Sequence, residues 1–273
     1  MAMSADDAVD CGDPESRPLG SEWDPRKIEH GPRSGETILF LHGGSSGAWA
    51  WSGQVELLPQ RHLLTPELPG YAGRACEDWP GTGGAADDVA TLIRDRAIDG
   101  KAHVVGLSLG GFVALQLAHK HPELLRSCLI TGSAVSGYSR IEKLAIAPQV
   151  PLWRRYWYWA AQAFAFRIPA EVRKQFAADG CAPSARTNRA MFREVVVGGL
   201  PRELAYTGPM LAVSGEKDSA SVRRGFPALC SVLPQTQTCI VPGVHHAWNA
   251  EDPELFARMV TTFADTGQWD PCG

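Results

Sequence analysis

The sequence predicts an α/β protein with a mostly parallel, doubly wound sheet and an inserted, mainly helical cap. Short apolar runs alternate with longer amphipathic runs along the chain. The short runs are continuous in apolar character, which is typical of strands covered by helices on both faces. The alternation breaks once, for about 70 residues after Ser133, and then resumes, which indicates an insertion into one core.

The elements of the core follow in order. The expected strands lie in ETILFLHG (36–43), RHLLTPELPG (61–70), AHVVGLS (102–108), SCLITGS (127–133), PMLAVSG (209–215) and TQTCIVPG (236–243). Amphipathic stretches at 84–99, 112–122 and 252–263 are expected to be helices, and Pro253 suits the start of the last one. We therefore expect a core of residues 23–133 and 207–273, a cap of residues 134–206, and a polar, acidic N-terminal tail of residues 1–22 that is too poor in apolar side chains to fold.

Composition excludes several classes of function. The 273 residues are 44% hydrophobic and 21% charged, with a formal net charge of −4, so nothing favours a nucleic-acid or membrane partner. The seven cysteines have no metal-ligand or disulfide spacing, and no apolar run reaches 18 residues. We expect a cytoplasmic protein with mostly reduced thiols and no metal that acts on a small molecule; its oligomeric state stays open.

The most informative motif is Gly106-Leu107-Ser108-Leu109-Gly110, at the end of an apolar strand-like run. A serine on a sharp turn between a strand and a helix has strained backbone angles, and small neighbours let the turn close. Such a turn presents the hydroxyl to a substrate. Ser108 is therefore a candidate nucleophile.

A serine nucleophile needs a base, and the base needs an acid to orient it. The candidates at the carboxyl edge of the sheet are His42 and the pair His245-His246, of which we favour His246. The strand ending in SGEKD brings Glu216 and Asp218 to the same edge. We favour Asp218 as the acid and expect Glu216 to be a solvated loop carboxylate.

Acyl transfer also needs donors that hold the oxyanion. The turn HGGSSG offers backbone amides at Gly43, Gly44 and Ser45, and Leu109 follows the candidate nucleophile at the start of a helix. We expect one amide of this turn and the amide of Leu109 to form the oxyanion hole, and His42 to be a structural hydrogen bonder.

Aromatic residues gather in the segment PLWRRYWYWAAQAFAFRIP of the cap. Their helical spacing predicts a helix that is apolar nearly all round and therefore covered on both sides. These rings either form the core of the cap or roof a substrate pocket. Candidates for the pocket are Ser45, Trp153, Trp157, Phe164 and Trp248.

The strings LFLHGGSSGAWAW, VVGLSLGGFVALQLA, LAVSGEKD and VPGVHHAWNAEDPELF resemble those of the α/β-hydrolase superfamily, in the same order, over about residues 36–133 and 208–266. The resemblance implies Ser108 as nucleophile, Asp218 as acid, His246 as base, and the amides of Gly44 and Leu109 as oxyanion hole. HGGSSGAWAW is also similar to the opening of plant-type methylesterases and hydroxynitrile lyases.

Three positions depart from the superfamily pattern. Glu67 stands where relatives commonly have Asp in the acidic-Leu-Pro-Gly turn, and we expect that change to be structural. His245 replaces a frequent Gly before the catalytic His, and Ala247 replaces the Lys that hydroxynitrile lyases carry after it. The last departure argues against a lyase.

The sequence thus predicts a cofactor-independent serine hydrolase that cleaves a carboxylic ester, lactone or thioester of a small apolar molecule. One alternative is another reaction on the same triad, such as carbon–carbon bond hydrolysis, perhydrolysis or a non-hydrolytic biosynthetic step, because a fold and a triad do not fix the reaction. Another is a small-molecule receptor without catalysis. Serine at position 108 disfavours an aspartate-nucleophile reaction.

Overall fold

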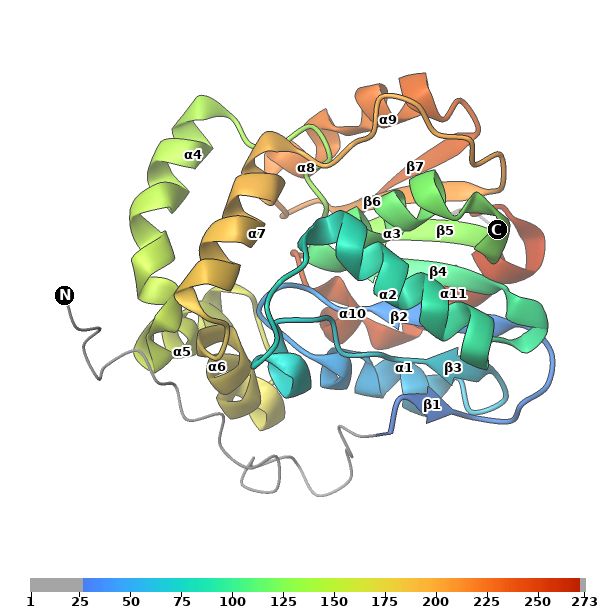
Figure 1. Ribbon diagram of the computed structural model, residues 1–273, viewed down its shortest axis with the longest axis horizontal. Coiled ribbons are helices and arrows are strands. Elements are labelled where there is room, and N and C mark those ends of the chain that lie inside the picture. The colour runs from blue at the N-terminus through green and yellow to red at the C-terminus, as the bar shows by residue number, and fades with distance from the viewer. Residues whose placement is uncertain (1–26, 271–273) are drawn as a thin grey trace.

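The computed structural model describes residues 27–270, so the tail expected at 1–22 lies outside the described residues. Its strands form one seven-stranded sheet in the order β1-β3-β2-β4-β5-β6-β7 (Figure 1). The strands are β1 (Glu29–His30), β2 (Thr37–Leu41), β3 (His62–Leu64), β4 (Ala102–Leu107), β5 (Leu125–Thr131), β6 (Met210–Gly215) and β7 (Thr236–Val241). All neighbouring pairs are parallel except β1 with β3. The mostly parallel sheet predicted from the apolar runs is confirmed.

Two helical layers cover the sheet because each strand sends alternate side chains to opposite faces. On one face, Leu39 and Val104 pack in a core with α2 (Gly81–Arg96), α3 (Leu109–Lys120) and α9 (Phe226–Val232). On the other face, Phe40 and Val105 pack in a core with α10 (Trp248–Glu251) and α11 (Pro253–Thr266), and α1 (Ser52–Leu57) packs on α11. Both faces of β4 are therefore buried, up to the residue before Ser108.

A helical segment occupies the chain between β5 and β6 and lies to one side of the sheet (Figure 1). Its elements are α4 (Arg140–Ile146), the 3-10 helix η7 (Ala147–Arg154), α5 (Tyr156–Ala165), η8 (Ala170–Val172), α6 (Arg173–Cys181) and α7 (Ala185–Val197). Trp153, Trp159, Phe176 and Ile168 form a separate apolar core there. These helices lie within the segment 134–206 that we call the cap.

Short helices complete the described chain: η3 (Ala48–Trp51), η4 (Ala72–Arg74), η5 (Ile98–Gly100), η6 (Pro122–Leu124) and α8 (Ala220–Arg224). No helix of residues 27–270 is long and apolar enough to cross a membrane. Four cysteines of this range are free, namely Cys128, Cys181, Cys230 and Cys239, whereas Cys76 is disulfide-bonded. Most of the described cysteines are thus free, as expected, and Cys76 is the exception, because sequence spacing does not show which cysteines meet in the fold.

The aromatic segment of the cap, residues 151–169, does not form the single helix, covered on both sides, that the sequence predicts. The chain leaves helical geometry at Arg155, where φ is −109° and ψ is 120°. Trp153 therefore belongs to η7 and is buried, whereas Tyr156, Trp157 and Phe164 belong to α5 and are exposed. One face of α5 is left without cover by the described residues.

Candidate active site

Ser108 lies at a sharp turn between β4 and α3, with φ 53° and ψ −112°. These are strained angles for a residue with a side chain. The turn is held by the Ser108 N–H, which donates to Thr131 O at 2.8 Å, and by the Ser133 hydroxyl, which donates to Ser108 O at 2.8 Å. The packing of β4 on β5 thus supports the strained residue, and its side chain faces a cavity.

The turn needs glycine where it crosses the neighbouring strand. A Cβ on Gly110 would lie 2.1 Å from Leu41 O, which no real side chain tolerates. The Gly-Leu-Ser-Leu-Gly spacing therefore reflects the close approach of the first turn of α3 to the end of β2.

His246 and Asp218 form a pair at the same edge of the sheet. Asp218 follows β6 and His246 follows β7, and His246 Nδ1 lies 3.0 and 3.1 Å from the two carboxylate oxygens of Asp218. Nδ1 is the donor, since an ionised carboxylate only accepts. Nε2 of His246 is thereby left as the nitrogen that can accept a proton.

The charges of this pair stabilise each other. Burial alone would lower the pKa of His246, but the charge of Asp218 and the hydrogen bond to it raise that pKa above its ordinary value. Burial raises the pKa of Asp218, but the charge and hydrogen bond of His246 and the N–H of Ser219 lower it overall. The site therefore favours an ionised Asp218 beside an imidazole that accepts a proton readily.

The neighbouring histidines have other partners. His245 Nδ1 lies 2.9 Å from Glu251 Oε2, and its backbone N–H donates to Glu251 Oε1. His42 is fully buried, and its Nε2 accepts a hydrogen bond from the Leu68 N–H. Its Nδ1 must then carry the proton that bonds Gly43 O at 2.8 Å, so His42 fixes the Gly43-Gly44 turn, as a structural hydrogen bonder would.

Glu67 also supports this turn region. Its side chain is buried, and Oε2 accepts a hydrogen bond from the Ala48 N–H at 3.1 Å. Oε2 lies 3.2 Å from His42 Nε2, but that nitrogen is already an acceptor, so the pair is a contact and not a hydrogen bond. Glu216, the acid we did not favour, accepts from the Gly243 N–H at 2.8 Å.

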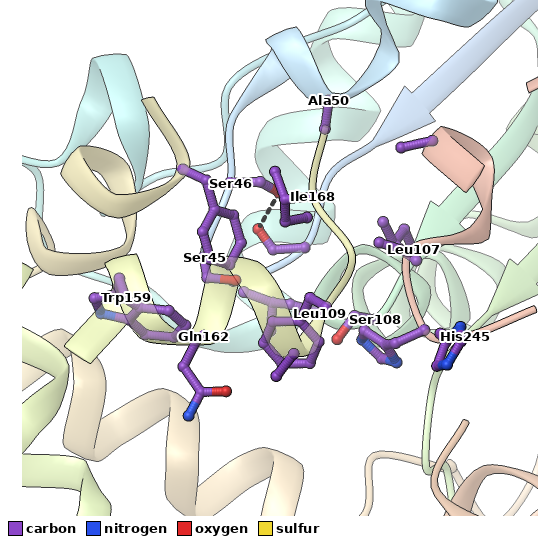
Figure 2. A pocket seen from close by; sticks show the side chains of 18 of the residues that line it. Ser45, Ser46, Ala50, Leu107, Ser108, Leu109, Trp159, Gln162, Ile168 and His245 are labelled. Atoms are coloured by element: carbon purple, nitrogen blue, oxygen red, sulfur yellow. Dashed lines mark hydrogen bonds between the residues drawn. The ribbon is translucent and has the colours of Figure 1, made fainter. Parts of the chain in front are cut away.

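A cavity of about 760 Å³ brings these residues together. Ser108, Asp218 and His246 line it, and so do Gly44, Ser45 and Leu109. Figure 2 shows Ser108 beside Leu109, with Ser45 and Ser46 nearby and Trp159 and Gln162 on the cap side. A Cβ built on Gly44 would lie 3.4 Å from Leu109 Cδ2, so Gly44 lies beside the Leu109 side chain.

The cap supplies the aromatic part of the lining. Trp153, Trp159, Phe166, Phe176 and Phe192 line the cavity together with Trp49 of η3. The ring centroid of Phe166 lies 5.8 Å from that of His246. The cap therefore covers the histidine and makes most of the cavity apolar.

Three of the residues that the sequence suggested for the substrate pocket lie elsewhere. Trp157 and Phe164 lie on the exposed face of α5, since the break at Arg155 turns that helix relative to Trp153. Trp248 is fully buried, packs on Phe256, and donates from Nε1 to Thr131 Oγ1 at 2.8 Å. Ser45 and Trp153 do line the cavity.

Two residues near the site were missed by the sequence analysis. Gly132 has φ +68°, and a Cβ there would lie 2.8 Å from His246 Cε1, so its lack of a side chain leaves room for the imidazole. Glu142 of α4 lines the cavity and binds the loop after Asp218. The apolar strand that ends just before Gly132 could have pointed to Gly132 as a residue at the carboxyl edge of the sheet. No nearby sequence pattern points to Glu142 as a residue of the site.

Among residues 27–270, no group of three or more His, Cys, Asp or Glu side chains is placed to hold a metal ion. The groups that line the site are a hydroxyl, an imidazole, a carboxylate and backbone amides. These groups converge where the parallel strands β4, β6 and β7 end, which is where open α/β sheets bind ligands.

Comparison with known proteins agrees with the fold. The model of the alpha/beta hydrolase family matches residues 38–259, and the chain belongs to this family. It is a hydrolase.

The chain is similar to several characterised or solved relatives. It is 32% identical over 85% of its length to an AB hydrolase superfamily protein of Gibberella zeae, of which it covers 80%. It is 28% identical over 83% of its length to a pimeloyl-acyl-carrier-protein methyl ester esterase of Yersinia enterocolitica, of which it covers 92%. The solved structure of a Rhodococcus esterase matches with a TM-score of 0.71 at 22% identity, over 88% of this chain and 94% of that one.

Proposed function

We propose that this protein is a serine esterase that cleaves carboxylic esters of small, largely apolar molecules through an acyl-enzyme. The observation that carries the proposal is a serine in strained geometry on the same cavity as a histidine paired with a buried carboxylate. The esterase names of the Yersinia and Rhodococcus proteins support ester hydrolysis. Lactones and thioesters are included, because their carbonyl carbons react in the same way.

In the first half-reaction, Ser108 Oγ attacks the ester carbonyl carbon while its proton moves to His246 Nε2. Asp218 holds the imidazole by Nδ1 and stabilises the positive charge that forms. The backbone N–H groups of Gly44 and Leu109 bind the oxyanion. The Leu109 amide suits this role because the first amides of a helix lack partners within that helix and carry its positive end.

The tetrahedral intermediate then breaks its bond to the alcohol oxygen, which takes the proton from His246 and leaves. Water attacks the acyl-enzyme with His246 as the base, and the carbonyl–Ser108 bond breaks to release the carboxylic acid. The proton returns to Ser108 Oγ through His246. These steps need no cofactor.

The cavity defines the substrate by size and polarity. A volume of about 760 Å³ suits a small organic molecule. Eight Trp, Tyr and Phe side chains line it, and polar side chains such as Gln149, Gln162 and Asn188 lie among them. We expect a substrate whose apolar acyl or alcohol part packs against Trp153 and Trp159, with the carbonyl at Ser108.

The test is turnover of p-nitrophenyl esters with acyl chains from acetate to decanoate. The wild type should hydrolyse at least part of the series, and Ser108→Ala should lose activity by at least about a thousandfold, because the nucleophile is removed. Ser136→Ala is the matched control, since Ser136 is an exposed serine. A Ser108→Ala enzyme that keeps the wild-type rate would overturn the proposal.

A further inference from the structure

The outer face of α5 is unusual for a helix in contact with water. The ten residues of α5 include no charged side chain. Tyr156, Trp157 and Phe164 are 49%, 60% and 67% exposed, and Ala161 is also exposed. Because residues 157, 161 and 164 share one side of a helix, they form a continuous apolar stripe. We call this stripe, with Tyr156, the α5 face.

The opposite side of α5 packs in the cap core and lines the cavity. Trp159 and Ala163 are buried in the cap core, and Tyr158 and Gln162 line the cavity over Ser108. The helix packs against α6 and lies at the edge of the molecule (Figure 1). The same ten residues thus roof the cavity and present apolar rings to the outside. Large exposed apolar patches are typical of surfaces that bind a membrane or another molecule.

Positive charge flanks the α5 face. Arg155 directly precedes the helix and Arg167 follows it, both exposed, and the Arg173 guanidinium lies 4.5 Å over the Phe164 ring. Between Arg140 and Ala170 the only acidic residue is Glu142. Its carboxylate is bound by Ser219, Ser221 and Arg224, so it does not neutralise the arginines. The nearest acid beyond this range is Glu171.

The charge of the whole chain conceals this local excess. The cap, residues 134–206, has eleven Lys and Arg against five Asp and Glu, whereas the whole chain has 26 against 30. Helix α4 repeats the pattern, since Ile141 and Leu144 are exposed beside Arg140 and Lys143. The cap is therefore a basic and apolar unit on an acidic protein.

We propose that the α5 face docks on an anionic lipid surface. Aromatic rings together with Arg and Lys are the side chains that suit the boundary between lipid headgroups and acyl chains. At 1.5 Å per residue, α5 is about 15 Å long, half the thickness of a bilayer core of about 30 Å. The helix therefore lies in the interface plane, and its arginines reach the headgroups.

A second copy of the chain fits the α5 face less well. Antiparallel pairing of two α5 helices would bring Arg155 of one copy near Arg167 of the other, and parallel pairing would bring like ends together. Both arrangements place positive charges side by side without an acid to separate them. An anionic partner is favoured by charge, and a lipid surface is favoured over a protein because exposed aromatic rings flanked by arginines suit the boundary between headgroups and acyl chains.

The docking has a consequence for the substrate that rests on the proposed esterase function. With α5 on the lipid, the cavity lies directly behind the membrane-facing helix. Esters of amphiphilic molecules, which partition into the lipid surface, would then be concentrated near Ser108. The docking itself does not depend on catalysis.

The experiment is co-flotation of the full chain with vesicles of phosphatidylcholine alone or with about one third phosphatidylglycerol. We expect binding to the anionic vesicles and at least about tenfold less to the neutral ones, with loss of binding as salt rises. Arg155→Glu/Arg167→Glu should lower anionic-vesicle binding at least about tenfold, because each basic residue near such a surface contributes about fivefold. Trp157→Ser/Phe164→Ser should lower it to a similar extent.

The matched charge control is Arg258→Glu, since Arg258 is an exposed arginine of α11 outside the cap. It should bind as the wild type does, and circular dichroism and thermal unfolding should show all variants folded. Ser108→Ala should also bind normally, so a failed esterase proposal would not remove the docking. Absent or salt-independent vesicle binding, binding at the wild-type level by either double variant, or a dimer that Trp157→Ser/Phe164→Ser converts to monomer would overturn the proposal.

Discussion

Glu142 of the cap and Ser219 of the core are joined by a hydrogen bond of 2.9 Å, from the Ser219 hydroxyl to Glu142 Oε1. The backbone N–H of Ser219 donates to Asp218 Oδ1 at 2.6 Å. Ser221 and Arg224 donate to Glu142 Oε2, each at 2.6 Å. The first helix of the cap is therefore fastened to the loop that holds the acid beside His246.

Glu142→Gln should lower kcat/KM for esters by about tenfold to a hundredfold, since a small displacement of a catalytic group can have such a cost. The amide keeps the size of the carboxylate but cannot accept from Ser219, Ser221 and Arg224 together. Glu203→Gln, a change at an exposed acid of the same cap segment, should leave kcat/KM unchanged. Equal kinetics for the two variants would show that the contact to Ser219 does not position Asp218.

The same change should affect stability in a pH-dependent way. Burial raises the pKa of Glu142, but hydrogen bonds from Ser139, Ser221 and Ser219 lower it well below its ordinary value of 4.5. The stabilisation by the ionised carboxylate is thus complete above pH 4.5 and is lost as the pH falls through the lowered pKa. Urea unfolding of wild type and Glu142→Gln should differ most near neutral pH and converge in acid.

Asp218→Asn should change both the rate and its pH dependence. In the wild type, kcat/KM should fall on the acid side around a pH above 6.5, because Asp218 raises the pKa of His246 and only the neutral imidazole is a base. Without that charge, burial remains and the acid limb should move below 6.5. The rate should drop on the order of 10⁴-fold.

The pH profile can be measured as initial rates at an isosbestic wavelength of p-nitrophenol. Asp270→Asn serves as the control for the loss of one negative charge, since Asp270 is an exposed acid beyond α11. An acid limb at the same pH in wild type and Asp218→Asn would show that His246 is not the titrating base, or that Asp218 does not face it in solution.

Gly110→Ala should destabilise the protein by on the order of 3 kcal/mol, because the added methyl would lie 2.1 Å from Leu41 O. Gly83→Ala in α2 is the matched glycine control. The nearest atoms to a Cβ there lie at 3.9 Å, so alanine should be tolerated and add about 0.5 to 1 kcal/mol. Chemical unfolding of both variants tests the difference, and an unaffected Gly110→Ala would contradict the close approach of α3 to β2.

Trp153→Ala should raise KM for long-chain or aryl esters by about tenfold or more, with kcat changed much less, because the indole offers uniform apolar binding. Tyr156→Ala is the aromatic control, since Tyr156 lies outside the cavity lining. With water-soluble esters, Tyr156→Ala should have the kcat and KM of the wild type. A fall in kcat alone at Trp153→Ala would mean that the ring acts on the reacting groups instead.

Much of the fold could be predicted because buried parallel strands leave a continuous apolar pattern. The strand around Leu63 is shorter than predicted, since Pro66 and Pro69 cannot donate to a ladder, and it ends at Leu64. His246 and Asp218 were favoured from chain order and strand ends alone. The structure places them within hydrogen-bond distance.

Other parts of the site were beyond prediction because they depend on contacts between distant segments. Glu142 and Ser219 are 77 positions apart, and no local pattern links them. The helical geometry breaks at Arg155, and this break turns Trp157 and Phe164 outward. Residue 155 is neither glycine nor proline, so the sequence does not predict the break. Trp248 closely follows His246 in sequence, yet the short helix α10 turns its ring into the core.

The most direct test of the central claim is covalent labelling with a fluorophosphonate, followed by mass spectrometry of the intact protein and its peptides. We predict one adduct per chain, on Ser108, and its loss in Ser108→Ala. Labelling should be strongly slowed in His246→Ala, because the serine then lacks its base. An adduct on another residue, or none in a folded wild-type protein, would contradict Ser108 as the nucleophile.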